Sequence, residues 1–376
     1  MGTVNTKSNH PHGKTFQWIL SDTSPMHEGG ASLVSWLLNG SGVYWIRGKA
    51  ASGKSTLMKL IARSPKTKEM LTIWAGRNQL LTASFYFWNI GTTEQRSHSG
   101  LLRSLLLSLL QRNRSLIQRT MSEIYGEISQ GFRSSNSPQK TNPPSDVEVK
   151  VGFLRLVQNL PPAVKVCLFI DGLDEYEGDV PDLLKLLLAT ASENFKMIVS
   201  SRPIPSCITA LKNYPHLRLE FLTRSDILLY TEQSLLPHPN AKHLLQENTT
   251  AVTRLVQEVA NRSDGVFLWV TLVVKLLLKA LDKNDSTGEL RELLDTLPRD
   301  LELLYKHMMD RMTEPHRKDA SWYMQMTLRS IEVQTGYRLN LAQCWLAERY
   351  SEESSAALIR ANGASGRSPV WNDRME

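Results

Sequence analysis

Four residues of one short segment have the types and the spacing that bind nucleotide phosphates. Gly48, Gly53, Lys54 and Ser55 follow the pattern G-x-x-x-x-G-K-[ST] within the run WIRGKAASGKSTL. In such a loop, backbone N–H groups surround the phosphates, the lysine reaches the β- and γ-phosphates as a catalytic cation, and the hydroxyl binds Mg²⁺. We therefore expect ATP or GTP with Mg²⁺, bound by Gly48, Lys49, Ala50, Ala51, Ser52, Gly53, Lys54, Ser55 and Thr56.

One position of this loop departs from the usual pattern. Ala51 stands where many such loops carry another glycine. If the backbone there has a positive φ, an alanine costs about 1–2 kcal/mol. The sequence thus leaves open whether the loop turns a nucleotide over or only holds one.

A second segment, VCLFIDGLDEYEG, supplies carboxylates. Asp171 ends an apolar run, so we expect it at the carboxyl end of a strand beside the glycine loop, as the acid that binds Mg²⁺. Asp174 and Glu175 follow, and either could orient or deprotonate the attacking water. The alternative for these two is a pair of solvated turn residues.

A third segment, IVSSRP, places Arg202 directly after another apolar run. A guanidinium at that end of a strand can contact the γ-phosphate and so distinguish a triphosphate from a diphosphate. The alternative is an ordinary salt bridge.

The elements that must position these residues alternate along the chain. Apolar runs that read as strands are separated by segments with helical spacing, which predicts an α/β fold with a parallel sheet and flanking helices. In such a sheet ligands bind at the carboxyl ends of the strands. The predicted strands cover residues 43–46, 83–88, 164–171, 195–202 and 218–222; the predicted helices cover 54–63, 100–112, 149–159, 183–191 and 225–236.

Two boundaries carry specific expectations. Residues 131–146 are rich in Ser, Pro and Asn, which predicts a surface loop. The helix after the fifth strand is expected to begin near Ser225 or Asp226, either of which could cap it.

The second half of the chain has helical periodicity only. We expect an all-α domain over residues 240–330, with breaks at Gly265 and Pro298. The apolar run 266–281 is interrupted by two lysines and is predicted to be a buried helix, not a membrane span. The division is therefore a disordered head (1–15), a P-loop NTPase domain (16–236), the helical domain, and a partly disordered tail (331–376).

The charge and cysteine content of the chain indicate what kinds of partner and compartment to expect. The formal net charge is +7, from 44 basic and 37 acidic residues that are spread along the chain, so we expect an anionic nucleotide but no nucleic acid. The three cysteines have no metal-binding spacing and read as buried thiols of a reducing, cytoplasmic compartment. No transmembrane segment is predicted.

The motifs GKAASGKST, LFIDGLDEYEG and IVSSRP, in this order, resemble the NACHT class of STAND nucleoside triphosphatases. The resemblance is to the fungal branch with a nephrocystin-like nucleotide-binding domain, found in heterokaryon-incompatibility and NOD-like receptor proteins. It covers about Thr15 to Met312. Members usually also carry an N-terminal effector domain and C-terminal repeats, neither of which we recognise in this sequence.

The resemblance implies a sheet in the order five-one-four-three-two and an ATP- or GTP-driven signalling switch. It makes Asp171 the Mg²⁺ acid, Asp174 and Glu175 the acidic pair after it, and Arg202 the first sensor. It also implies self-association or association with related NACHT proteins. The segment GVFLW (265–269) resembles the one that closes over the nucleotide, but lacks the proline that many relatives carry.

Three functions compete at this point. The first is a slow nucleoside triphosphatase switch, and the second is a regulatory module that holds a nucleotide without significant hydrolysis. The third is a P-loop kinase, against which the paired acids after Asp171 and the long helical region argue.

Overall fold

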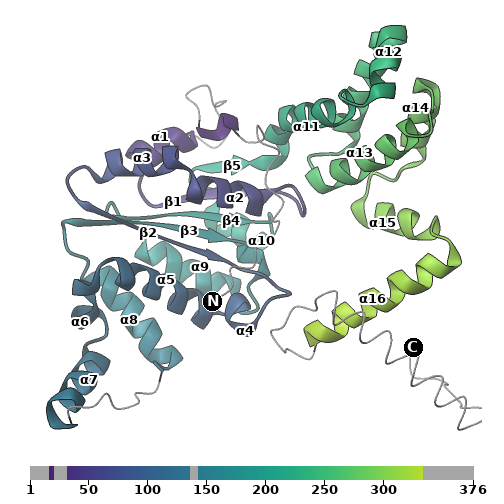
Figure 1. Cartoon of the computed structure of the whole chain (residues 1–376). Coiled ribbons are helices and arrows are strands. Elements are labelled where there is room, and N and C mark those ends of the chain that lie inside the picture. The colour runs from purple at the N-terminus through teal and green to yellow at the C-terminus, as the bar shows by residue number, and fades with distance from the viewer. Residues whose placement is uncertain (1–16, 21–31, 136–142, 333–376) are drawn as a thin grey trace, which may run out of the picture. The chain divides into compact units, whose positions relative to one another are not determined.

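The computed structural model describes residues 17–20, 32–135 and 143–332 (Figure 1). The chain divides into two compact units, residues 1–307 and 308–376. In the second unit the described part holds α16 (Glu314–Glu332). The predicted head lies outside the described residues, as does all but the first two residues of the predicted tail, 331–376.

The first unit contains a five-stranded sheet whose strands are all parallel. They are β1 (Val43–Arg47), β2 (Gln79–Tyr86), β3 (Val164–Asp171), β4 (Phe195–Ser201) and β5 (His216–Arg218). Their order is β2-β3-β4-β1-β5, which confirms the implied order five-one-four-three-two. All the strands are parallel and β4 lies between β3 and β1. The segments that follow these three strands therefore meet at the carboxyl edge of the sheet.

Helices cover both faces of this sheet, as a parallel sheet requires. Figure 1 shows α1 and α3 on one side and α5, α8 and α9 on the other. The first face packs against α1 (Leu33–Asn39), α2 (Lys54–Arg63) and α3 (Pro65–Ala75). The second packs against α5 (His98–Arg112), α8 (Asp146–Gln158), α9 (Val180–Thr190) and α10 (Pro205–Leu211).

Alternation along the strands explains the two cores. In β1, Val43 and Trp45 point into one core while Tyr44 and Ile46 point into the other. Side chains on successive strand residues point to opposite faces, and both sets here are apolar. The predicted α/β class with flanking helices is therefore confirmed.

The fifth strand was predicted in the wrong place. β5 covers only residues 216–218 and pairs with Trp45–Arg47 of β1. α11 (Leu219–Leu235) begins directly after it. Ser225 and Asp226 therefore lie inside that helix and do not cap it. β5 is an edge strand with only three paired positions, so a short apolar segment is enough to form it. The apolar residues that follow, from Leu219 on, belong to α11.

The predicted loop 131–146 is partly wrong. α7 (Ser122–Ser135) continues through its first five residues, and residues 136–142 lie outside the described part. α8 begins at Asp146, earlier than predicted, because Ser145 and Glu148 form a capping box that fixes the helix start. Five short elements also belong to the described part of this unit: η1 (Gln17–Leu20), α4 (Thr93–Arg96), η2 (Arg114–Leu116), α6 (Ile117–Thr120) and η3 (Leu173–Glu175).

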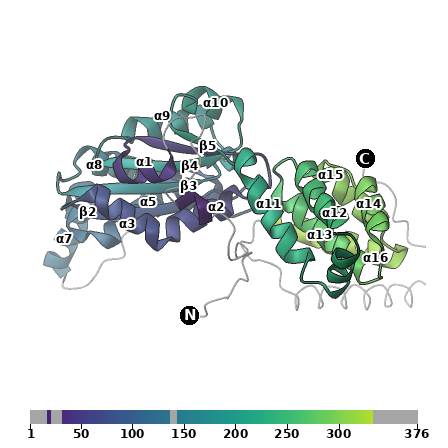
Figure 2. The ribbon, with the colours of Figure 1, turned by 90° about the horizontal axis from the view of Figure 1, so that it is seen from above.

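After β5 every regular element that the structure describes is a helix. Besides α11 and α16, these are α12 (Pro239–Arg262), α13 (Phe267–Leu281), α14 (Thr287–Thr296) and α15 (Leu301–Asp310), seen from above in Figure 2. The breaks at Gly265 and Pro298 are confirmed. Within α12, Asn248 has non-helical angles (φ −152°, ψ 83°) and kinks the helix.

α13 is the buried helix predicted from the apolar run. Trp269, Val270, Val273 and Leu277 are all fully buried, and the Trp269 indole N–H donates to the carbonyl of Pro298 at 2.7 Å. None of the described helices has the length and apolarity needed to cross a bilayer.

The two cysteines that the structure describes are buried thiols outside any disulfide, Cys167 on β3 and Cys207 on α10. This agrees with the expectation. Cys344 lies outside the described residues.

Close packing of α5 on α4 generates a stability prediction. A Cβ at Gly100 would lie 1.7 Å from the backbone oxygen of Glu94, so Gly100→Ala must displace a helix. We expect it to lower the free energy of unfolding by about 3 kcal/mol. Gly126→Ala in α7 is the matched control, because nothing lies within 4 Å of its new Cβ. It should raise stability by about 0.5–1 kcal/mol. Urea unfolding that ranks the two variants the other way would contradict this packing.

Candidate nucleotide-binding site

Three segments that are distant in sequence meet at the carboxyl edge of the sheet. Arg47 at the end of β1 is paired with Ser201 at the end of β4, and the Gly48 N–H donates to the Ser201 carbonyl at 3.3 Å. β3 lies on the other side of β4 and ends at Asp171. The glycine loop, the acids after β3 and Arg202 after β4 are thus brought to one place.

The glycine loop has a backbone that only certain residues fit. Gly53 has φ 97° and precedes α2 without a side-chain cap. A Cβ at Gly48 would lie 2.7 Å from the Ser52 hydroxyl and 3.2 Å from Leu219 Cβ. Gly53 is therefore required by its positive φ, a side chain at Gly48 would have to displace Ser52 or Leu219, and the amino end of α2 opens toward the loop.

Ala51 has φ 57°, in the left-handed region. The sequence predicted a cost for alanine if φ is positive at this position, and φ is positive. The backbone here therefore has a conformation that disfavours an alanine. Its carbonyl accepts a hydrogen bond from the N–H of Leu268 at 3.3 Å.

Lys54 lies inside the loop. Its ammonium donates to the carbonyls of Gly48 at 2.8 Å and Lys49 at 2.7 Å. Burial lowers the pKa of Lys54, an effect that the charge of Asp174 opposes. The cation is therefore desolvated and close to the acids that follow β3.

Asp171 is a buried carboxylate, with 2% of its surface exposed. It accepts hydrogen bonds from the side chains of Ser200 and Ser55. The Ser200 hydroxyl in turn accepts the N–H of Gly172 at 3.0 Å. Burial raises the pKa of Asp171, while these hydrogen bonds and the charge of Lys54 act in the opposite direction. The two residues predicted to bind the metal, Ser55 and Asp171, are therefore in contact.

Asp174 and Arg202 form a pair. The Arg202 backbone N–H donates to Asp174 Oδ1 at 2.9 Å, and Arg202 Nε lies 3.0 Å from Oδ2. The Asp174 side chain is 6% exposed and the Arg202 side chain 50%. Arg202 therefore forms a salt bridge, which was the alternative to a phosphate-contacting role. This salt bridge lies within the site, where Asp174 holds the half-exposed guanidinium of Arg202 beside the glycine loop.

Glu175 has a different environment. Its Oε2 accepts the backbone N–H of Asn89 at 3.1 Å, and burial raises the pKa of its carboxyl group, with smaller contributions from Asp174 and Asp171. A raised pKa suits a group that takes part in proton transfer near neutral pH. Glu175 forms no ion pair with Arg202, so the adjacent acids differ in their partners.

Sequence analysis missed Ser200 and Asn89. Ser200 is a fully buried hydroxyl on β4, a strand in which every residue is buried, and a polar residue that directly follows the apolar run 197–199 is a signal that could have marked it. Asn89 acts through its backbone, which leaves no signal in the sequence.

The connection between α12 and α13 touches the loop. Besides the bond from Leu268 to Ala51, the ammonium of Lys49 forms an ion pair with Asp264. Asp264 and Gly265 have φ 47° and 77°, which forms a tight turn. The segment 265–269 thus lies against the glycine loop, as its resemblance implied.

The loop fits a phosphate group. Ser52 is fully buried, and its hydroxyl has no hydrogen-bond partner among the described residues. Such a group needs a partner, because an unpaired buried hydroxyl costs about 1–3 kcal/mol. The space that a side chain at Gly48 would fill lies beside it. Ser55 and Asp171 offer the oxygen ligands that Mg²⁺ takes together with substrate phosphates.

The conformation of Ala51 predicts a stability change. Ala51→Gly should raise the free energy of unfolding by about 1 kcal/mol, because glycine adopts positive φ without steric cost. Ala50→Gly is the matched control: its φ is not positive, so the added flexibility of the unfolded chain should lower stability slightly. Denaturant unfolding of both variants checks this, and equal effects would contradict a strained Ala51.

The burial of Asp171 predicts a pH effect. Because its folded pKa is raised, the folded state binds more protons, and this carboxyl's contribution to stability falls as pH rises from about 4 through the folded pKa. Asp171→Asn should therefore be as stable as the wild type at pH 4 and more stable at pH 8. Asp182→Asn, an exposed change on α9, should alter stability by less than about 0.5 kcal/mol at either pH. A variant less stable than the wild type at pH 8 would contradict the assignment.

Comparison with known proteins identifies the family. The family described as nephrocystin 3, N-terminal, matches residues 14–202, which is 189 of the chain's 376 residues. No curated protein matches the chain. The matched range contains the glycine loop and the acids after β3, and its last residue is Arg202. It is consistent with a NACHT-like nucleotide-binding module, and the chain belongs to the nephrocystin 3 N-terminal family.

Proposed function

We propose that this protein binds ATP or GTP with Mg²⁺ and hydrolyses it slowly, as a signalling switch of the NACHT-type STAND class. The observation that carries the proposal is the meeting of Lys54, the Ser55–Asp171 pair and Arg202 at one edge of the sheet. A lysine-bearing glycine loop alone would support phosphate binding only. The acids and the guanidinium add the groups that hydrolysis and sensing need.

Each side chain has a role in this proposal. Lys54 leaves its carbonyl partners to contact the β- and γ-phosphates, and the Ser52 hydroxyl donates to a phosphate oxygen. Ser55 and Asp171 would hold Mg²⁺, which supplies positive charge against the phosphate oxygens when bound. Arg202 contacts the γ-phosphate while Asp174 fixes its position.

Glu175 is the residue we propose to orient the attacking water. Both carboxylate oxygens of Asp174 are used by Arg202, whereas Glu175 holds one backbone N–H through Oε2. The raised pKa of Glu175 also brings it closer to the range in which a carboxylate accepts a proton efficiently.

Switching would act through the α12–α13 turn. The turn contacts the loop at Lys49 and at Ala51, so a change in the loop on nucleotide exchange alters these contacts. We propose slow turnover, since a switch needs long-lived states. Self-association or association with related NACHT proteins, and a cytoplasmic role in fungal self/non-self recognition or immunity-like signalling, extend this proposal from the family resemblance.

A second candidate is a module that holds nucleotide without significant hydrolysis. The left-handed conformation of Ala51 favours it, because strain in the loop opposes the geometry that binding or turnover requires.

Nucleotide loading and single-turnover phosphate release distinguish the two. The wild type should co-purify with, or take up, a purine nucleotide whose base identifies ATP or GTP. Lys54→Ala should lose that binding. Glu175→Gln should keep the nucleotide but lose phosphate release by about 10²- to 10⁴-fold. Asp174→Asn should chiefly weaken the discrimination of triphosphate from diphosphate, because it releases Arg202.

Two results decide the outcome. If folded, nucleotide-loaded wild type releases no more phosphate than Glu175→Gln does, the switch hypothesis is wrong and the module that only holds nucleotide is supported. Folded wild type that takes up no nucleotide at all would overturn both.

A further inference from the structure

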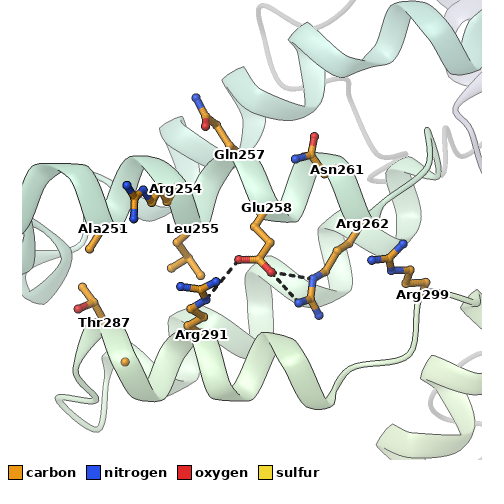
Figure 3. Close-up of a pocket in the computed structure, with 11 residues that line it drawn as sticks. Ala251, Arg254, Leu255, Gln257, Glu258, Asn261, Arg262, Thr287, Arg291 and Arg299 are labelled. Atoms are coloured by element: carbon orange, nitrogen blue, oxygen red, sulfur yellow. Dashed lines mark hydrogen bonds and ion pairs between the residues drawn. The ribbon is translucent and has the colours of Figure 1, made fainter.

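A cavity lies in the helical part of the first unit. It has a volume of about 530 Å³ and lies between α12 and α14 (Figure 3). A volume of this size is typical of sites for small molecules. No residue of the glycine loop lines it, so it is distinct from the nucleotide site.

Its lining is strongly basic. Four arginines line the cavity against one carboxylate, that of Glu258. Arg254 and Arg262 come from α12, Arg291 comes from α14, and Arg299 follows α14. The chain as a whole has 44 basic and 37 acidic residues, so a ratio of four arginines to one carboxylate is a local concentration of positive charge.

Only part of this charge is neutralised within the protein. Arg262 lies 2.6 Å from Glu258 Oε1 and also pairs with Asp295, while Arg291 Nε lies 3.7 Å from Glu258 Oε2. Figure 3 shows Glu258 between Arg262 and Arg291. Arg254 and Arg299 make no ion pair with any residue that the structure describes.

Arg262 has a structural task, because it joins α12 to α14. It donates to the Leu294 carbonyl at 2.7 Å as well as binding Asp295. Its side chain is largely buried. This contact holds the two walls of the cavity together. Arg254 and Arg299 remain available to a ligand, and Arg291 is held only by the 3.7 Å contact with Glu258.

We propose that this cavity, the arginine pocket, binds a small molecule with several phosphate groups. Guanidinium groups bind phosphate through two parallel N–H bonds, and several of them around one cavity favour a multiply charged ligand. The first residues of α14, Thr287 and Gly288, also line the cavity, but the Glu289 carboxylate of the capping box offsets the positive end of that helix, so the attraction comes from the guanidinium groups.

The arginine pocket adjoins the surface of the glycine loop. A neighbouring cavity of about 510 Å³ shares three of its lining residues, Asn261, Arg262 and Arg299. Its other lining residues include Lys49 and Ala50 of the glycine loop. A ligand in the arginine pocket would therefore contact residues that border the loop. This position suits a ligand that influences nucleotide binding, but its binding does not depend on the proposed nucleotide function.

The test uses the full chain with the Lys54→Ala substitution, so that the loop lysine cannot bind the probe. Calorimetric titration with inorganic tripolyphosphate should show binding at one site. Arg254→Gln with Arg291→Gln should weaken it by about tenfold or more for each guanidinium removed. Arg299→Gln alone, at an exposed arginine without an ion pair, should weaken it similarly and guards against misfolding of the double variant.

The matched control is Arg114→Gln with Arg119→Gln, two exposed arginines outside the cavity. This variant has the same change in net charge and should bind tripolyphosphate within about twofold of the parent. An equal loss in the control would overturn the proposal, since it would indicate general attraction to a basic protein. Citrate that binds as tightly as tripolyphosphate, or an RNA oligomer that binds more tightly and is lost in the same variants, would also overturn it.

Discussion

The site depends on one buried negative charge, the carboxylate of Asp171. A carboxylate removed from water is costly unless other groups stabilise it, and the fold supplies them from three segments. Ser200 on β4 and Ser55 on α2 hydrogen-bond to it, and Lys54 lies close by. The sheet order makes this possible, because β4 lies between β3 and β1 and so joins the acid at the end of one strand to the loop at the end of the other.

The balance of charge around Asp171 explains the roles of its neighbours. Two cations, Lys54 and Arg202, face three acids, Asp171, Asp174 and Glu175. The pKa values of Asp171 and Glu175 are both raised, chiefly by burial, and the charges of Asp171 and Asp174 add to the shift of Glu175. A divalent cation would relieve this cost, and its two extra charges would also offset those of the phosphates. In the proposed function, the same groups would therefore favour Mg²⁺ and nucleotide together over either one alone.

Parts of this arrangement could be predicted because their physics is local. The run 164–171 is apolar apart from Lys165 until it ends in an acid, so β3 was predicted with its observed bounds. β5 was misplaced because a three-residue edge strand leaves no periodicity, and Leu219 to Leu222 fits a strand as readily as a helix. The different partners of Asp174 and Glu175 could not be predicted, since adjacent acids have the same chemistry. Only tertiary contacts with Arg202 and Asn89 distinguish them.

The arginine pocket was missed for a related reason. Its arginines come from α12, from α14 and from the segment after α14, and in each segment an isolated arginine reads as a solvated helix face. Only the packing of α12 against α14, fixed by Arg262, turns these faces toward one cavity. A concentration of charge that arises from tertiary packing has no pattern along the chain.

The glycine loop links these two regions. Ala51 has a left-handed backbone conformation that is unfavourable for a residue with a side chain. Two contacts hold this part of the loop: the Ala51 carbonyl accepts a hydrogen bond from the Leu268 N–H, and nearby Lys49 pairs with Asp264. Contacts from the α12–α13 turn therefore offset part of the strain in the loop. A loop of unstrained residues would keep its shape whatever the helices did. Here the energy of the phosphate-binding conformation depends on the helical part, because weakening those contacts leaves the strain of Ala51 uncompensated.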